Sequence, residues 1–412
     1  YTGSAGQFVS SPALTSPFTS EFSNDARVNG QFVLGRWSSG TTGDSETTFQ
    51  TYFDRAARSE FHADTVTLSL DMEAQHRFRL GKIQEMIAGL GYRFNRDDIV
   101  GSTDVSFDPN HDTYHLFSAF IQDEISLPQN VKLTLGSKFE HNSFTGLEIQ
   151  PSARILWQAD AKNTLWAAVS RAVRTPSRTA NTGTIKAAVT PGTPPVETRL
   201  FGSSDIQSEE LTAIEVGYKT RPLPTLSIDI ATFYNIYDRL TSTDQGSVFA
   251  EATPAPAHLV RPLTFANNVS GEAYGVELGA DWRMRDWVRM RAAYTYFELE
   301  LHRAPGRGIP VNEAVEDRDP RHQLSLTTQF DLARNLELDI TLRAVDRLSE
   351  RRVSGYATAD FRIGWRPREN IELSLVGQNL GQSRHLEFRP ELLGAEETEV
   401  ERAVYGKIKV SF

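Results

Sequence analysis

Hydrophobic and polar residues alternate with a period of two along many segments of this 412-residue chain. In residues 335–346 the even positions from Leu336 to Ala344 are apolar, while the odd positions from Glu337 to Arg343 are charged or polar. A helix would spread these apolar residues around its whole circumference, whereas a strand collects them on one face. The pattern therefore predicts a β-strand with one apolar and one polar face.

The end of the chain follows the same rule. Its apolar set is Val404, Gly406, Ile408, Val410 and Phe412, and its interleaved set is Tyr405, Lys407, Lys409 and Ser411. Such a strand fits an amphipathic soluble sheet or the wall of an outer-membrane β-barrel, where one face meets lipid and the other meets water. This strand alone leaves both interpretations open.

The lengths of the connections decide between them. Short turns are expected at Pro128–Asn130, Asp160–Asn163, Arg221–Pro224, Arg283–Asp286, Ala333–Asn335 and Arg366–Asn370. Longer polar loops lie between them, at Asn95–His111, Pro176–Gln207, Ser242–Arg261, His302–Asp319 and Arg384–Thr398. Short turns on one rim and long loops on the other are typical of bacterial membrane barrels. The prediction is an all-β, antiparallel transmembrane β-barrel, with about 17 strands from Ala26 to Phe412 and a strand tip plus loop in Tyr1–Asn24.

Composition agrees with this fold. Hydrophobic residues make up 39% of the chain and the mean hydropathy is −0.39, so no stretch reaches the roughly 18 apolar residues of a spanning helix. A barrel strand needs apolar residues only at alternate positions. The chain has no cysteine, which excludes thiolate chemistry, and its net charge of −10 argues against nucleic acid as a partner.

An ordered set of short motifs resembles the TonB-dependent outer-membrane receptors that import iron complexes. The motifs are Ser170–Ser177, Ser208–Leu211, Glu215–Tyr218, Asn267–Glu277, Asp319–His322 and Val376–Leu380. Each is weak alone, but their order is kept through essentially the whole chain. The resemblance implies a 22-stranded barrel, of which residues 1–412 would be a partial barrel domain, strands five to twenty-two.

The resemblance also implies a function. The family takes up scarce nutrient complexes, with ferric siderophores as the leading class here, and an inner-membrane TonB complex supplies energy through a plug domain. Nothing in the chain resembles that plug or a TonB box. The chain would lie among the lipid and lipopolysaccharide of the outer membrane, with long loops outside the cell and short turns and C-terminus in the periplasm. A passive porin and a surface adhesin remain the alternatives.

Candidate ligand contacts are few. Arg171 and Arg174 could meet an anionic siderophore, and the loops that carry Phe201, Phe249 and Arg261 are plausible contact regions because binding residues concentrate on loops.

Other chemistry is not expected. Lumen-facing charges such as Arg289 and Asp339 are expected to solvate the wall. His111 and His115 would lie roughly 13 Å apart on one strand face, too far for shared metal ligation. No catalytic motif is present, so we expect no enzyme, no metal and no cofactor.

Overall fold

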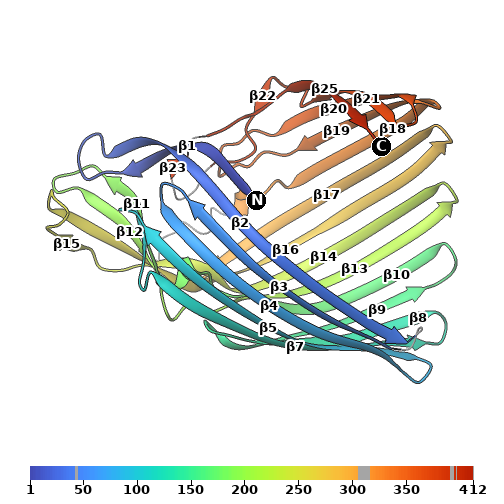
Figure 1. Ribbon diagram of the computed structural model, residues 1–412, viewed down its shortest axis with the longest axis horizontal. Coiled ribbons are helices and arrows are strands. Elements are labelled where there is room, and N and C mark those ends of the chain that lie inside the picture. The colour runs from blue at the N-terminus through green and yellow to red at the C-terminus, as the bar shows by residue number, and fades with distance from the viewer. Residues whose placement is uncertain (42–44, 305–315, 390–393, 396, 412) are drawn as a thin grey trace.

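The structure is a computed structural model, and it describes residues 1–41, 45–304, 316–389, 394–395 and 397–411. Eighteen long strands build a curved wall (Figure 1). They are β1 (Thr2–Pro12), β2 (Thr19–Thr41), β3 (Ser45–Ser59), β4 (Ala63–Leu80), β5 (Gln84–Gly101), β7 (His111–Leu127), β8 (Val131–Asn142), β9 (Gly146–Gln158), β10 (Asn163–Arg174), β13 (Glu209–Leu223), β14 (Leu226–Gln245), β16 (His258–Arg285), β17 (Val288–Arg303), β18 (His322–Ala333), β19 (Leu336–Val345), β20 (Tyr356–Arg368), β21 (Ile371–Gln378) and β25 (Ala403–Val410).

The remaining elements belong to the connections. They are β6 (Val105–Phe107), α1 (Arg178–Thr182), β11 (Gly183–Thr190), β12 (Val196–Phe201), β15 (Phe249–Glu251), β22 (Arg384–His385), β23 (Gly394–Ala395) and β24 (Val400–Glu401). Figure 1 shows β11, β12 and β15 gathered at one end of the wall, and tight turns at the other. We call these the long-loop end and the short-turn end. No helix in the described part of the chain is long and apolar enough to cross a membrane.

Successive wall strands pair antiparallel, which confirms the predicted fold class. The seventeen strands from β2 to β25 match the expected number, and β1 is the strand expected at the start of the chain. Several ladders continue further into the loops than the apolar pattern indicated. β5 stays paired with β7 as far as Asp98, and β14 with β16 as far as Gln245, because backbone hydrogen bonds need no apolar side chain.

The wall has an apolar outer face. The strand registers align one row of side chains across five strands: Leu165, Tyr218, Ile230, Leu278 and Tyr294. The neighbouring rows on this face are also mostly apolar, and many of their large side chains are exposed. Exposed apolar side chains over this much surface call for an apolar surrounding such as lipid.

The opposite, inner face carries charges that pair across strands. Arg362 donates to Asp339 at 3.0 Å and to Glu372 at 2.5 Å, and Arg289 donates to Asp281 at 2.8 Å. Arg289 and Asp339 were expected in the lumen, and the structure pairs them with charges on neighbouring strands of the wall. The strands that carry these residues therefore keep the two-faced pattern read from the sequence.

The wall is open along a seam. Within the described residues β25 pairs with β21 alone, while β1 pairs with β2 and touches β23 over two residues. Beyond Gly30, the edge of β2 on the β1 side has no strand partner in the described ranges. Val404, Ile408 and Val410 share the outer face of β25 as expected, and Phe412 lies outside the described residues.

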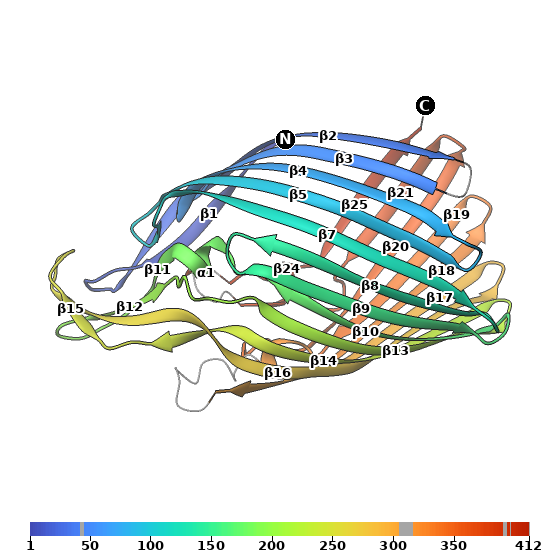
Figure 2. The same ribbon diagram turned by 90° about the horizontal axis from the view of Figure 1, so that it is seen from below.

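A second layer forms at the long-loop end (Figure 2), and we call it the loop sheet. β6 pairs with β11, β11 with β12, β12 runs parallel to the first part of β16, and β15 pairs with that same part. Val105, Ile185 and Leu200 form its buried core, with Phe107 and Phe265 packed against them. The loops of this end are thus a folded structure supported by the wall.

Candidate functional site

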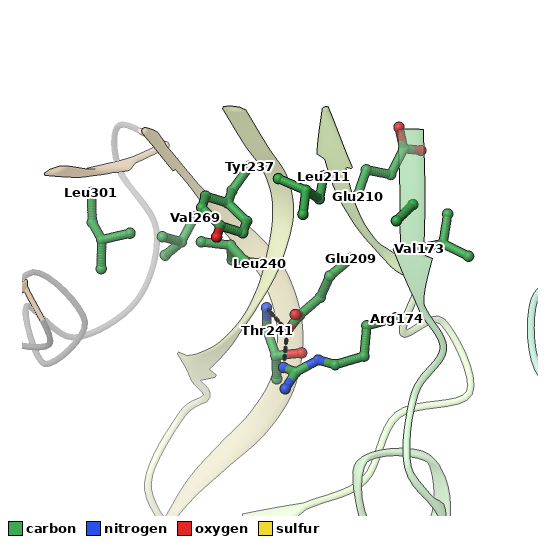
Figure 3. A pocket seen from close by; sticks show the side chains of 11 residues that line it. Val173, Arg174, Glu209, Glu210, Leu211, Tyr237, Leu240, Thr241, Val269 and Leu301 are labelled. Atoms are coloured by element: carbon green, nitrogen blue, oxygen red, sulfur yellow. Dashed lines mark hydrogen bonds and ion pairs between the residues drawn. The ribbon is translucent and has the colours of Figure 1, made fainter. Parts of the chain in front are cut away.

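A pocket of about 510 Å³ lies at the long-loop end, where β10, β13, β14, β16 and β17 run side by side (Figure 3). Its lining residues are Ala172, Val173, Arg174, Glu209, Glu210, Leu211, Tyr237, Leu240, Thr241, Val269 and Leu301. Most of the lining is apolar, with a polar group at one side. We call this the rim pocket.

The strand registers explain how distant residues meet in the rim pocket. Ala172 lies opposite Leu211, Leu211 opposite Tyr237, and both Tyr237 and Leu301 lie opposite Gly271. These paired residues lie on the inner face, because each is an even number of positions along its strand from the positions that carry the inner-face charges. Val269 and Leu301 are almost fully buried, at 5% and 9% exposure. Aromatic and aliphatic side chains on neighbouring strands therefore offer an apolar surface toward the inside of the wall.

The polar side of the rim pocket is built on one carboxylate. Glu209 Oε1 accepts from Arg174 Nη2 at 2.5 Å and from the backbone N–H of Thr241 at 2.9 Å, as the dashed lines in Figure 3 show. The Glu209 side chain is only 12% exposed, whereas that of Arg174 is 75% exposed. The guanidinium is thus held by one contact while most of it stays open to a ligand.

Arg171, the other predicted arginine, points the opposite way. It is three residues from Arg174 on β10, so the two side chains lie on opposite faces. Its Nη2 is 2.8 Å from Glu210 Oε1, and its Nη1 donates to the carbonyl oxygen of Ile149. Arg171 therefore fastens β10 to its neighbours, and Arg174 alone of this pair lines the rim pocket.

The three loop candidates converge in the loop sheet. Phe201 ends β12 and lies beneath the Arg199 guanidinium, 6.0 Å from it. Phe249 lies opposite Val260 on the β15–β16 ladder, and Arg261 follows Val260 on β16. Phe249 is 41% exposed, so it is the most accessible large apolar side chain of this group. None of the three lines the rim pocket, and their part in ligand contact stays a prediction.

A buried charge cluster holds the loop sheet together. Arg199 Nε donates to Glu197 Oε1 at 2.6 Å, and its two terminal nitrogens bind both oxygens of Glu251 at 3.1 and 2.9 Å. Glu197 and His258 are almost fully buried. His258 Nε2 lies 3.5 Å from Glu251 Oε2, while its Nδ1 donates to the Pro256 carbonyl at 3.0 Å. Arg199 thus binds two carboxylates. Its contact with Glu251 is bidentate, which is the strongest geometry for an arginine–carboxylate pair.

Acid should loosen this cluster. The hydrogen bonds from Arg199 hold the pKa of the Glu251 carboxyl below its ordinary value of 4.5, against an opposing effect of burial. A carboxyl with a lowered pKa stabilises the fold fully above its ordinary pKa, and that stabilisation is lost as the pH falls through the lowered value. We expect the amide protection factors of β12 and β15 in hydrogen exchange to fall as the pH is lowered from about 5 through the lowered pKa of Glu251.

Glu251→Gln is the matched control for this experiment, because it removes the titrating carboxyl and keeps the size of the side chain. Its protection factors should vary less with pH over the same window than those of the native chain. Equal slopes for both proteins would show that Glu251 does not carry the effect.

Sequence reasoning missed most of the rim pocket and the charge cluster. Within the described ranges, no group of three or more histidine or acidic side chains is placed to hold a metal ion. In the sequence, nothing distinguishes Tyr237, Leu240 and Leu301 from other wall residues. The charge cluster was missed because Glu197 and His258 are far apart in sequence. The one available signal was the Glu197-x-Arg199 spacing, which puts opposite charges on one strand face.

Comparison with known proteins identifies relatives. A family model described as "TonB dependent receptor-like, beta-barrel" matches residues 8–380. The iron-regulated outer membrane virulence proteins of two Vibrio cholerae O1 strains are each 24% identical to this chain, one over 198 and the other over 203 residues. Each match covers 47% of this chain and 29% of the Vibrio protein.

Solved structures share the fold. The siderophore receptor PirA from Acinetobacter baumannii superposes with a TM-score of 0.71 at 15% identity, covering 94% of this chain and 63% of that one. A ferric enterobactin receptor variant from Pseudomonas aeruginosa, in complex with enterobactin, gives 0.70 at 18% identity with the same coverage. The copper transporter OprC gives 0.68 at 13% identity, covering 94% and 66%. The chain therefore spans under two thirds of the length of the first two structures.

Proposed function

The chain belongs to the TonB-dependent receptor family, and from this membership we propose that it acts in the uptake of a scarce nutrient complex across the bacterial outer membrane. A ferric siderophore is the leading substrate class. Two solved structures with this fold are named as receptors for siderophores, and the Vibrio relatives are named as iron-regulated. The family and these relatives are receptors and transporters, so the proposed activity is transport and no bond chemistry is assigned.

The rim pocket is the observation that carries the proposal. It joins an apolar surface, made by Leu211, Tyr237 and Leu301, to the exposed guanidinium of Arg174. Siderophores combine apolar or aromatic parts with anionic groups around the iron, and such a ligand would use both surfaces. Pockets that fix a ligand by one charged group on an apolar lining are the common form of small-molecule sites.

The proposed placement follows from the two faces and two ends of the wall. The apolar outer face would contact lipid and lipopolysaccharide, with the long-loop end outside the cell and the short turns in the periplasm. The substrate would then meet the loop sheet and the rim pocket first. Energy would come from a TonB complex acting on a plug domain, and the residues that the structure describes include no such domain.

Uptake of radioactive iron by cells tests the function. Cells that carry the complete gene should take up a ferric siderophore, with ferric enterobactin as the first probe and a ferric hydroxamate as the second. We expect saturable uptake of at least one probe that stops when the tonB gene is deleted. Non-saturable uptake that continues without TonB would instead identify a passive pore.

Filling the rim pocket tests the site. Ala172→Trp would place an indole in the pocket, and we expect probe affinity to fall about tenfold, which corresponds to about 1.4 kcal/mol. Ala168→Trp is the matched control, because it lies on the same strand and face, four residues away, and does not line the pocket. Equal binding by the two variants would remove the rim pocket from the proposed path.

A further inference from the structure

A further row of side chains crosses the inner face of the wall on the short-turn side of the rim pocket. It runs over six strands, from β9 through β10, β13, β14 and β16 to β17, which lie side by side in Figure 1. Its members, in strand order, are Arg154, Ala168, Glu215, Phe233, Gly275 and Phe297. We call this the mid-wall row.

The mid-wall row continues the surface of the rim pocket. From Ala168 to Phe297, each member is four positions along its strand from one of the paired residues described for the pocket, so the two rows are about 13 Å apart. The inner-face row between them is uncharged, with Ser170, Ala213, Asn235, Ala273 and Leu299. A ligand that leaves the pocket along these strands therefore meets no charged side chain before the mid-wall row.

Aromatic side chains lie over two glycines of this face. A Cβ atom added to Gly275 would come within 2.6 Å of the Phe233 ring, and one added to Gly217 would come within 2.2 Å of Trp166 Nε1. Phe297 lies beside Phe233, with their ring centroids 6.4 Å apart. All three aromatic side chains are partly exposed. The two glycines thus leave room for an aromatic surface on the inner face.

Arg154 ends the mid-wall row on β9. Its guanidinium carbon lies 4.8 Å from the centroid of the Trp166 ring, and the residue is exposed. In the described part of the chain its guanidinium has no hydrogen bond or ion pair, and Glu215, the acid of the same row, is two strands away. Stacking on an aromatic ring holds a guanidinium in place and leaves the N–H groups in its plane free to donate. Arg154 therefore offers unused donors to the inside of the wall.

The inner face of β19 and β20 differs in this respect. Arg343 Nη2 donates to Asp360 at 2.8 Å, and Arg362 donates to Asp339 at 3.0 Å. Acids of the wall already neutralise these two guanidiniums, so an anionic ligand gains less by meeting them. Arg154 and the exposed Arg174 of the rim pocket instead provide accessible positive charge on the β9–β17 side of the wall.

We propose that the Arg154–Trp166 pair and the mid-wall row form a second contact site for the substrate, which an iron complex with anionic oxygens reaches after it leaves the rim pocket. Arg154 donates to the oxygens of the complex, while Phe233 and Phe297 contact its apolar parts. The inference rests on the proposed function, because it takes the ligand of the rim pocket as its own. A second contact of this kind speeds passage along the wall and adds little to the first capture of the substrate.

Cells that carry the complete gene test the proposal. Binding of radioactive ferric enterobactin and of a ferric hydroxamate is measured in cells without the tonB gene, and uptake in cells with it. One variant is Arg154→Gln, and a second, Ala168→Trp, places an indole in the mid-wall row. The matched control is Arg343→Gln, which removes an inner-face arginine from the charge-paired side of the wall. A heat-modifiable shift on a semi-native gel checks that each variant is a folded barrel.

We expect Arg154→Gln and Ala168→Trp to bind the transported probe as the native protein does, but to take it up about tenfold more slowly. Arg343→Gln should match the native protein in both measurements. Arg154→Lys, which keeps the positive charge, should recover part of the uptake.

Uptake at the native rate in Arg154→Gln would overturn the proposal, and so would an equal loss in Arg343→Gln. Entry of vancomycin into Arg154→Gln cells would overturn it as well, because this antibiotic is excluded by an intact outer membrane and its entry would show that Arg154 holds the plug in place. Absence of TonB-dependent uptake of both probes by the native protein would instead overturn the proposed function, and this inference with it.

Discussion

Ile340→Arg should destabilise the barrel by about 2–4 kcal/mol, the known range for a cation at mid-wall on a lipid-facing strand position. Ile340 lies opposite Thr328 on β18 and Phe361 on β20, in the interior of the sheet and on the outer face. A guanidinium there would lose its hydration without gaining a partner. Urea unfolding in lipid vesicles, followed by the heat-modifiable gel shift, measures the change.

Thr341→Arg is the control at the adjacent position. Thr341 faces inward, where its hydroxyl meets that of Thr327 at 3.1 Å and Asp360 is its cross-strand neighbour. An arginine here enters a polar, charged surface, so the cost should stay within about 0.5 kcal/mol. Equal losses for both substitutions would mean that the faces of β19 are assigned the wrong way round.

Arg199→Gln should destabilise the loop sheet by about 3–5 kcal/mol, the cost of removing one partner from a buried ion pair. The substitution leaves Glu197, which has no exposed surface, and Glu251 without their shared cation. Of the cationic side chains in the described residues, His258 would then be the one left near both carboxylates. Hydrogen exchange of β11, β12 and β15 should then rise by about two to four orders of magnitude, while the wall strands change little.

Arg174→Gln gives the comparison for an exposed pair. Its guanidinium also binds a glutamate, at 2.5 Å, but its side chain is mostly in solvent. Exposed ion pairs contribute about 0–1 kcal/mol, so exchange in the loop sheet should stay nearly as it is. If the two variants behave alike, the Arg199 cluster is not what holds the loop sheet.

The wall could be predicted because the signal for a strand, an alternation of apolar and polar residues, lies within the strand's own sequence. The period of two from Leu336 to Ala344 is enough to predict a strand with one lipid-facing side. In the structure these residues share one face of β19. The alternation of short turns and long loops is equally local. The strand ends were less accurate, since hydrogen-bond ladders such as Asp97 opposite Asp112 continue where the side chains are already polar.

The candidate site could be predicted only in part. Arg174 was named from a motif and does line the rim pocket, but most of the apolar residues beside it come from four other strands. Which side chains become neighbours depends on the register of every intervening strand pair, and a shift of one residue would reverse the faces. Arg171 is a second example: the motif identifies both arginines, but it does not show that their side chains lie on opposite faces.

The sequence by itself determined the class of the protein, the two faces of its strands, their number and order, and its resemblance to one receptor family. The faces depend on neighbours within a few residues, and the strand number and the resemblance depend on the order of such local patterns along the chain. Only the tertiary structure decided where the rim pocket, the mid-wall row and the buried Glu197–Arg199–Glu251–His258 cluster lie. Each is assembled from strands distant in sequence, through registers and a parallel β12–β16 pairing that long-range contacts alone select.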